Sequence, residues 1–406
     1  MNNGSLSQYF HGVTAKKLSA VEADSTVSRQ HEFNATVEMK KLFGPERRSF
    51  EGTVFLYLSD EKETVKSFGK LTWYDARENH PTRSEYRIFY QCPDVMDCAK
   101  ENDSLFICLM KDEKVLALIA EGNSTVEAQL YWLFGLTPDS RKITVREISQ
   151  DDVRVNIPAN EILETIGIEP VIEDDGHWLS AMMERYDGSF PSTRIFSAFA
   201  RETVRWKTEC MDSADDILVE WLNQEETLFR IYEKYMIQTR LDAGFRDVDD
   251  FIQYSLSVQN RRKSRVGQAL ENHFEEILKQ WKLLYVRTPV TENHSKPDFV
   301  FPGIEEYHNQ SFPEAGLTML GVKSTCKDRW RQVLAEADRI KDKHLLTLQG
   351  SISRNQTDQM QANNLHLVIP ESIRTTYDQY QRNWIMTVHD FLGMVRSAQN
   401  EYVNGY

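Results

Sequence analysis

The chain carries two patterns of apolar positions, and the change between them divides it into two parts. Residues 1–150 alternate short apolar runs with turn residues, which is typical of strands, and the strand-like runs lie at 53–58, 86–90, 104–109 and 115–119. From residue 191 onward apolar residues recur at helical spacing, as at Ile217, Leu218, Trp221, Leu222 and Leu228. We therefore expect a mostly β N-terminal part and a C-terminal part that begins with helices.

An acidic stretch at 151–190 separates the two patterns. Pro158 and Pro170 interrupt it, and acidic residues dominate its charge. We interpret it as a linker, which predicts one domain at 1–150 and a second at 191–406. The helical stretch 191–258 is expected to pack on a sheet of the second domain or to form a dimer surface.

Two polar side chains stand at the ends of short apolar runs in the second domain. Asp298 follows Lys296-Pro297 and precedes the apolar run 299–301, and Lys323 follows the apolar run 318–322. Both runs read as buried strands, and two such strands side by side would bring Asp298 and Lys323 together. A Pro-Asp pair alone is common at turns, so only the whole arrangement indicates a site.

Two glutamates are candidates to complete this site. A metal-dependent nuclease usually has an acidic residue two positions before the lysine, but Gly321 stands there and offers no ligand. From residue 327 onward the pattern predicts a helix, which carries Glu336 beside its apolar stripe. A second helix is predicted to begin at Ser264 and places Glu271 near its start.

These residue types suit phosphodiester hydrolysis. Carboxylates hold Mg²⁺, and a cation orients the attacking water. We expect Asp298, Lys323 and Glu336 to be catalytic, with Asp298 and Glu336 as metal ligands and Glu271 as a fourth member. The basic run 261–265, which includes Arg261 and Arg262, is either a solvated surface or a clamp for phosphates, and its place before the Glu271 helix favours the clamp.

Several stretches resemble the EcoRII-type restriction endonucleases. In the second domain they are residues 257–265, Lys296-Pro297-Asp298-Phe299 and residues 322–332; in the first they are residues 17–20 and 82–85. The resemblance runs through most of 175–406 and more faintly through 1–150. It implies a multidomain protein, with a B3-like pseudobarrel as N-terminal effector domain and an α/β restriction-endonuclease-like (PD-(D/E)XK) domain with added helices.

The resemblance also implies how DNA is bound and cut. Lys327, Asp328 and Arg329 would read base edges, which fits their chemistry because Arg and Lys bond guanine and Asp accepts from cytosine. The N-terminal domain would contact DNA through Arg83, Glu85, Arg87 and the region around His31. A homodimer using Mg²⁺ would cut both strands of double-stranded DNA at a CCWGG-like site, paired with a DNA methyltransferase, and the N-terminal domain would inhibit cleavage until it binds a second site.

Net charge, cysteine content and the lack of long apolar runs further limit the kinds of protein that the sequence can encode. The net charge is −14, and counting by segment gives −3 for 1–150, −13 for 151–250, +3 for 251–350 and −1 for 351–406, so the candidate core is locally basic. The five cysteines show no zinc spacing, and Cys326 lacks a nearby His to activate it, so we interpret all five as reduced and structural. No transmembrane run or signal peptide is recognisable, which predicts a cytoplasmic protein without membrane contact.

Two other functions stay open on the sequence alone. One is a DNA-binding regulator that keeps the nuclease fold without cleaving; the intact set of Asp298, Lys323 and Glu336 argues against it. The other is a nuclease of the same fold with repair or structure-selective activity.

Overall fold

The computed structural model describes residues 5–23, 31–91, 93–138, 142–149, 157–170, 176–204, 214–326 and 329–403. The chain divides into two compact units. Unit 1 comprises Met1–Val171 and Ser351–Gln356, and unit 2 comprises Ile172–Gly350 and Thr357–Tyr406. The main boundary falls within the acidic stretch 151–190 of the sequence. No helix among the described residues is long and apolar enough to cross a membrane.

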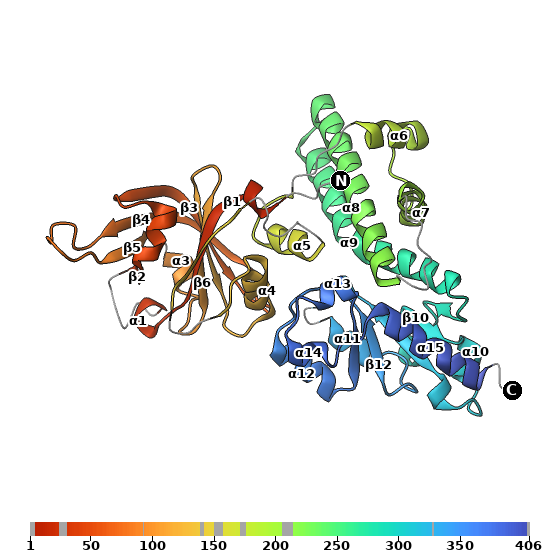
Figure 1. The fold of residues 1–406 in the computed structure, drawn as a ribbon. Coiled ribbons are helices and arrows are strands. Elements are labelled where there is room, and N and C mark those ends of the chain that lie inside the picture. Colours follow the sequence, from red (N-terminus) through yellow and green to blue (C-terminus); the bar gives the residue numbers. More distant parts are fainter. Residues whose placement is uncertain are drawn as a thin grey trace. The chain divides into compact units, whose positions relative to one another are not determined.

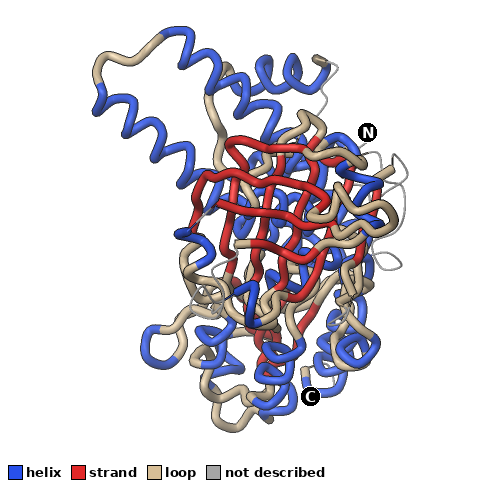
Figure 2. Tube along the Cα trace, turned by 90° about the vertical axis from the view of Figure 1, so that its left-hand side faces the viewer, coloured by secondary structure: helices blue, strands red, loops and turns tan. Residues whose placement is uncertain are grey.

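Unit 1 is built on an eight-stranded sheet of order β2-β5-β4-β3-β7-β6-β1-β8 (Figures 1 and 2). The β3–β7 pair is parallel, and the other pairs are antiparallel. The strands are β1 (Phe10–Lys17), β2 (Glu32–Asn34), β3 (Arg48–Leu58), β4 (Val65–Asp75), β5 (Tyr86–Gln91), β6 (Ser104–Met110), β7 (Val115–Ala120) and β8 (Thr144–Glu147). The strand-like runs expected from the sequence all lie within β3, β5, β6 and β7.

Both faces of this sheet are buried, which explains why its central strands read as continuous apolar runs. Phe55 and Tyr57 of β3 belong to one core, and the alternate residues Leu56 and Leu58 belong to the other. The short helices are η1 (Leu6–Gln8), α1 (Ala20–Ala23), η2 (Val37–Met39), α2 (Lys40–Phe43), α3 (Pro93–Met96), α4 (Thr125–Leu133) and α5 (Ile157–Thr165). Helix α5 lies in the segment expected to be a linker, yet its Ile162 and Leu163 are buried in the core of unit 1.

Residues 351–356 complete unit 1 from a distant part of the chain. The backbone N–H of Ser353 donates to Thr125 Oγ1 at 3.1 Å, and Gln356 Nε2 donates to Asp60 Oδ2 at 3.3 Å. Asp60 also accepts from the backbone N–H groups of Thr125 and Val126 at the start of α4. Unit 1 is therefore assembled from two separate segments of sequence.

Unit 2 contains a five-stranded mixed sheet of order β13-β12-β11-β10-β9. Its strands are β9 (Val286–Arg287), β10 (Phe299–Phe301), β11 (Thr318–Val322), β12 (Lys343–Leu346) and β13 (Leu365–Val368). Strands β11, β12 and β13 are parallel, and β10 pairs antiparallel with both β9 and β11. The antiparallel β10–β11 pair brings the start of β10 beside the end of β11.

Helices surround this sheet and precede it. They are α6 (His177–Tyr186), α7 (Thr193–Thr203), α8 (Ala214–Ala243), α9 (Val248–Gln280), η3 (Glu292–His294), α10 (Ile304–His308), η4 (Glu314–Gly316), α11 (Trp330–Leu334), α12 (Arg354–Ala362), α13 (Glu371–Arg374), α14 (Gln379–Arg382) and α15 (Val388–Tyr402). Helices α8 and α9 lie side by side as a hairpin (Figure 1). Phe274 of α9 contacts Phe299 of β10, and Phe391 of α15 contacts Phe301 of β10, so both helices pack on the sheet.

Candidate active site

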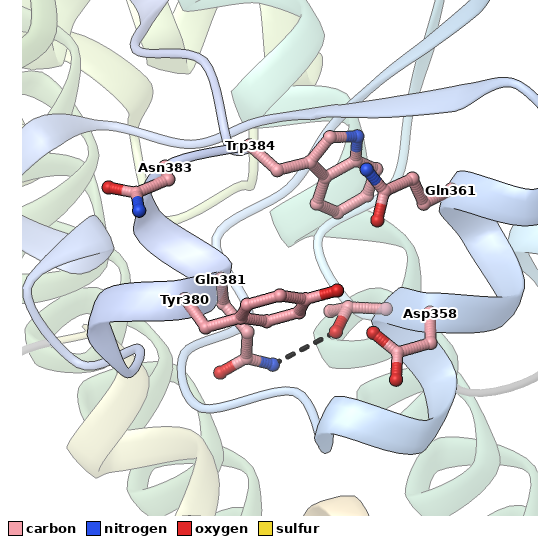
Figure 3. Close-up of a pocket in the computed structure, with 7 residues that line it drawn as sticks. Asp358, Gln361, Tyr380, Gln381, Asn383 and Trp384 are labelled. Carbon is pink, nitrogen blue, oxygen red and sulfur yellow. Dashed lines mark hydrogen bonds between the residues drawn. The ribbon is translucent and has the colours of Figure 1, made fainter.

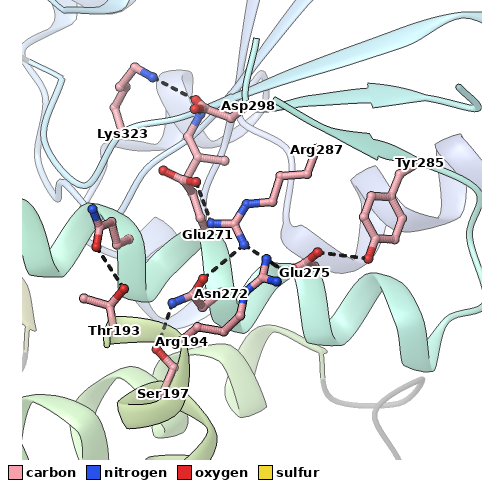
Figure 4. A network of polar contacts seen from close by, with 12 residues as sticks. Thr193, Arg194, Ser197, Glu271, Asn272, Glu275, Tyr285, Arg287, Asp298 and Lys323 are labelled. Atoms are coloured by element: carbon pink, nitrogen blue, oxygen red, sulfur yellow. Dashed lines mark hydrogen bonds and ion pairs between the residues drawn. The ribbon is translucent and has the colours of Figure 1, made fainter. Parts of the chain in front are cut away.

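Asp298 and Lys323 meet at the junction of β10 and β11, as the sequence predicts (Figure 4). Lys323 Nζ lies 2.8 Å from Asp298 Oδ2, and the backbone N–H of Val322 donates to the same oxygen at 2.6 Å. Both side chains are mostly buried, with 12% of Lys323 and 14% of Asp298 exposed. The backbone N–H of Lys323 donates to Leu346 O, which fixes the lysine to β12 as well.

Packing explains why glycine stands at position 321. A Cβ on Gly321 would lie 2.9 Å from Cγ2 of Val333, a distance that real Cβ contacts do not show. Gly321 is buried in β11, and α11 carries Val333 directly against it. A carboxylate side chain has no room here, so another part of the chain must supply the second carboxylate.

Glu336 is the candidate for that carboxylate, although it does not lie in a helix. The prediction of a helix carrying Glu336 is wrong, because α11 ends at Leu334 and Glu336 lies in the bend that follows. The next residue, Ala337, has a φ of 51°, which helical backbone does not adopt. Buried Lys343 holds this bend, since its Nζ donates to the carbonyl oxygens of Glu336 and Ala337.

This arrangement leaves one oxygen of the Glu336 carboxylate without a partner. Its Oε2 is buried and has no hydrogen-bond partner in the described structure. Burial and the charge of Asp298 raise the pKa of Glu336 to about 7, against the opposing charges of Lys323 and Lys343. A buried carboxylate oxygen without a partner beside a second carboxylate is suited to receive a cation.

Glu271 is held differently, by Arg287 of β9 (Figure 4). Arg287 Nη2 donates to Glu271 Oε2 at 2.8 Å, and Nη1 donates to Glu275 Oε2 at 2.8 Å and to Asn272 Oδ1 at 3.0 Å. Burial and the charge of Asp298 raise the pKa of Glu271, which places it within electrostatic reach of the Asp298–Lys323 pair. The expected position near a helix start is wrong, because α9 begins at Val248 and Glu271 lies in its last third.

The same network connects α9 to α7. Asn272 Nδ2 donates to Ser197 Oγ at 3.2 Å, and Thr193 Oγ1 donates to Gln268 Oε1 at 2.9 Å. Arg194 also pairs with Glu275 at 3.1 Å, although 69% of its side chain is exposed. Polar contacts thus run from α7 through α9 and β9 to the Glu271 carboxylate (Figure 4).

The donor set fits one divalent ion of the magnesium type. Among the described residues no group of three or more His, Cys, Asp or Glu side chains is placed to hold a metal. Mg²⁺ keeps several waters and is usually bound by only one or two carboxylates. Asp298 and the open Oε2 of Glu336 would hold such an ion, whereas Arg287 already occupies one oxygen of Glu271.

The residues expected to contact DNA in unit 2 are only partly described. Lys327 and Asp328 lie outside the described residues, and Arg329 is exposed just before α11. Arg262 Nε pairs with buried Glu233 at 2.6 Å, and the Arg261 guanidinium lies over the ring of Phe190. Both arginines therefore contact their own chain, and 42% of the Arg262 side chain stays exposed for a further partner.

Two of the residues expected to contact DNA in unit 1, Glu85 and Arg87, belong to an ion-pair cluster at β5. Arg87 pairs with Glu32 at 2.7 Å and with Glu85 at 2.6 Å. Arg83 is exposed and has no ion pair within the described part of the chain, so it is available to a partner. His31 is exposed, has a φ of 48° and accepts a backbone hydrogen bond from Tyr90.

Sequence reasoning missed Arg287 and Lys343, the two cations that position the glutamates. Arg287 lies 16 residues from Glu271 in the sequence, and only the pairing of β9 with β10 brings the two together. Lys343 opens the apolar run of β12. A charged residue at the edge of a short apolar run was the available signal, and neither position belongs to a recognisable motif.

Unit 2 also has a cavity of about 280 Å³ between α12 and α14 (Figure 3). Gln381 Nε2 donates to Thr357 Oγ1 at 3.0 Å in its wall. Its lining residues are Thr357, Asp358, Gln361, Tyr380, Gln381, Asn383 and Trp384. None of them is a candidate catalytic residue, and the cavity has no lysine or second carboxylate, so we do not place the chemistry there.

Comparisons of the sequence with known proteins find similarity to restriction enzymes. The family described as EcoRII C terminal matches residues 229–392, which include all four candidate catalytic residues. The Type II restriction enzyme EcoRII of Escherichia coli is 41% identical over 392 residues, covering 94% of this chain and 93% of that enzyme.

The similarity to solved structures is weaker than the sequence similarity to EcoRII. Metal-depleted Ecl18kI in complex with uncleaved DNA has a TM-score of 0.46 and 17% identity, covering 57% of this chain and 87% of that chain. A complex of restriction endonuclease PspGI with substrate DNA has a TM-score of 0.43 and 17% identity, covering 52% and 94%.

Proposed function

Because this chain belongs to the EcoRII family of Type II restriction enzymes, and is therefore a site-specific endonuclease, we propose that it cuts both strands of double-stranded DNA at a short C/G-flanked, CCWGG-like site. Restriction endonucleases of this type generally use a divalent metal ion, and we propose Mg²⁺. We also propose that it acts as a homodimer, since two strands need two active centres, and that a DNA methyltransferase protects the same sites.

The observation that carries this proposal is the cluster of Asp298, Lys323 and Glu336. Bound between Asp298 and Glu336, Mg²⁺ would supply Lewis-acid stabilisation of the scissile phosphate and lower the pKa of a bound water. Lys323, held by Asp298, orients the attacking water and offsets negative charge at the phosphate. Lys343 fixes the backbone of the Glu336 bend through two carbonyl oxygens, so the side-chain carboxylate is not needed to hold the bend.

Replacement of the three residues tests the proposal. Asp298→Ala, Lys323→Ala and Glu336→Ala should each abolish cleavage of unmethylated plasmid in Mg²⁺, while gel-shift binding to the site survives. Glu271→Ala should have an intermediate effect because Arg287 already engages that carboxylate. Lys341→Ala, at an exposed lysine, is the matched control and should cut normally. Near-normal cutting by any of the three variants would remove that residue from the set.

The wild-type digest separates the competing functions. Discrete bands support site-specific cutting, a smear indicates a general nuclease, and intact DNA indicates a binding protein without cleavage.

Base reading is proposed for Lys327, Asp328 and Arg329. Arg329→Ala should cost roughly 1–3 kcal/mol of discrimination between the site and its single-base variants, as expected for one lost base-edge contact. Arg262→Ala should instead weaken binding to all DNA and flatten its salt dependence. Glu233→Gln is the control for losing the Arg262–Glu233 pair alone. An unchanged preference in the Arg329 variant would exclude it as a reader.

Unit 1 is proposed to be a B3-like effector domain. It would bind a second copy of the site through Arg83, Glu85, Arg87 and the region around His31, and it would restrain cleavage until that copy is bound. The two-sided core of its sheet and the exposed Arg83 support a separate binding domain without catalytic groups.

A further inference from the structure

The outer face of the α8–α9 hairpin is apolar and exposed. Val248, Ile252 and Leu256 of α9 are 73%, 46% and 52% exposed, and their spacing of four residues places them on one stripe of the helix. Leu241 and Phe251, at 50% and 48%, extend this surface near the turn between the helices. Scattered exposed apolar residues are normal, but a contiguous patch marks an interaction surface.

The inner face of the same hairpin contains three ion pairs. Between α8 and α9, Arg240 pairs with Asp250 at 2.7 Å, Glu233 pairs with Arg262 at 2.6 Å, and Glu226 pairs with Arg265. Ion pairs therefore lie toward α8, together with buried Val258, while Val248, Ile252 and Leu256 of the same helix face solvent. A helix at a protein surface usually exposes its polar side chains, so these three apolar residues are left for another partner.

The charges around the stripe identify that partner. Asp249 and Lys263 are exposed, and each lies seven residues, or two helical turns, from Leu256, since 256 − 249 and 263 − 256 both equal 7. Neither side chain has an ion pair within the described part of the chain. A helix with opposite charges placed symmetrically about an apolar centre is complementary to an antiparallel copy of itself.

We propose that α9 residues 248–263 form a two-fold contact with α9 of a second copy of this chain, with Leu256 at its centre. Asp249 of each copy then faces Lys263 of the other, and Ile252 and Leu256 pack between these charge pairs. The inference deepens the proposed homodimer and rests on it. The contact also bears on the active centre, because the same helix carries Glu271 farther along.

Charge exchange in the full chain tests the contact without DNA or metal. Sedimentation velocity over a range of concentrations should show a wild-type dimer. Asp249→Lys and Lys263→Asp should each raise the dimer dissociation constant by roughly tenfold, because each creates two like-charge contacts. The double variant, which exchanges the charges, should return to within about threefold of wild type. A double variant as weak as the single ones, or a monomeric wild-type protein, would overturn the proposal.

A central substitution gives an independent test. Leu256→Arg should abolish the dimer because two cations would meet at the two-fold axis, whereas Leu284→Arg, at a residue 52% exposed outside α9, should not. Thermal unfolding of each variant shows whether the fold is kept. A dimer that responds to the exchange but does not cut DNA contradicts the proposed function alone. An active enzyme whose sedimentation mass is the same in all these variants contradicts this inference alone.

Discussion

Arg287 gives the sharpest prediction at the residue scale. Its guanidinium holds Glu271 and Glu275 together, and the hydrogen bonds and charges of both outweigh burial and raise its pKa. Arg287→Met should lower the cleavage rate about 10- to 100-fold, the usual effect of removing a group that orients a residue beside a metal site. The Mg²⁺ concentration for half-maximal rate should rise, and binding of the site in Ca²⁺ should persist.

Arg194→Met is the matched control for Arg287. Arg194 pairs with Glu275 but not with Glu271, so its loss should leave the rate within about twofold of wild type. Equal effects of the two variants would show that the network is only structural.

Gly321 gives a second residue-scale prediction, on stability. Gly321→Ala should destabilise the protein by about 1–3 kcal/mol in urea unfolding, because the added methyl group overlaps Val333. Adding Val333→Ala should recover part of that difference. Gly393→Ala is the control, since nothing lies within 4 Å of its Cβ position, and it should not destabilise. A stable Gly321→Ala protein would mean that β11 and α11 separate easily.

Sequence patterns could place Asp298 and Lys323 but not the geometry of Glu336. The first two residues sit at strand ends, and strand pairing alone brings them together. Glu336 depends on a left-handed Ala337 and on Lys343 beneath the bend, and an apolar stripe cannot reveal either. The raised pKa of Glu336 is consistent with its place among the candidate residues. The helix predicted to carry it does not form, because α11 ends at Leu334.

At the scale of elements, Asp215 joins three helices. It stands at the start of α8 and accepts hydrogen bonds from the backbone N–H groups of Glu371, Val388 and His389, at the first turns of α13 and α15. Asp215→Ala should cost about 2–4 kcal/mol of unfolding free energy because buried donors lose their acceptor. Asp216→Ala, at the exposed neighbour, should change little. Calorimetry or urea unfolding compares the two variants. Similar stabilities would show that Asp215 does not stabilise the junction of the three helices.

Element boundaries show why helices were harder to predict than strands. The sequence places a helix start at Ser264, but the helix begins at Val248 and runs through the basic stretch 261–265, where Arg262 and Arg265 pair with α8. The sequence also predicts one closing helix at 378–399, but this segment holds two helices, α14 and α15. Met386 lies between them and bridges to Val368 of β13, a contact over long sequence distance that local periodicity cannot reveal.

At the scale of the whole molecule, the proposed restraint by unit 1 can be measured. A chain beginning near residue 176 should cut single-site plasmid faster than the full chain, while the full chain should prefer two-site plasmid. Full-length Thr125→Val is a necessary control, because truncation also removes the partners of Ser353 and Gln356. Equal full-length rates on both plasmids, or a slower truncated chain on one site, would exclude the restraint.

The split composition of unit 1 has a consequence for how the protein is made. Residues 351–356 leave the ribosome after residues 172–350, so a nascent unit 1 lacks Ser353 and Gln356 while most of unit 2 is synthesised. Until then Thr125 Oγ1 lacks the Ser353 contact and Asp60 lacks the Gln356 contact. Unit 1 thus reaches its final form only after Asp298, Lys323 and Glu336 have all been translated, and the two units mature together rather than in succession.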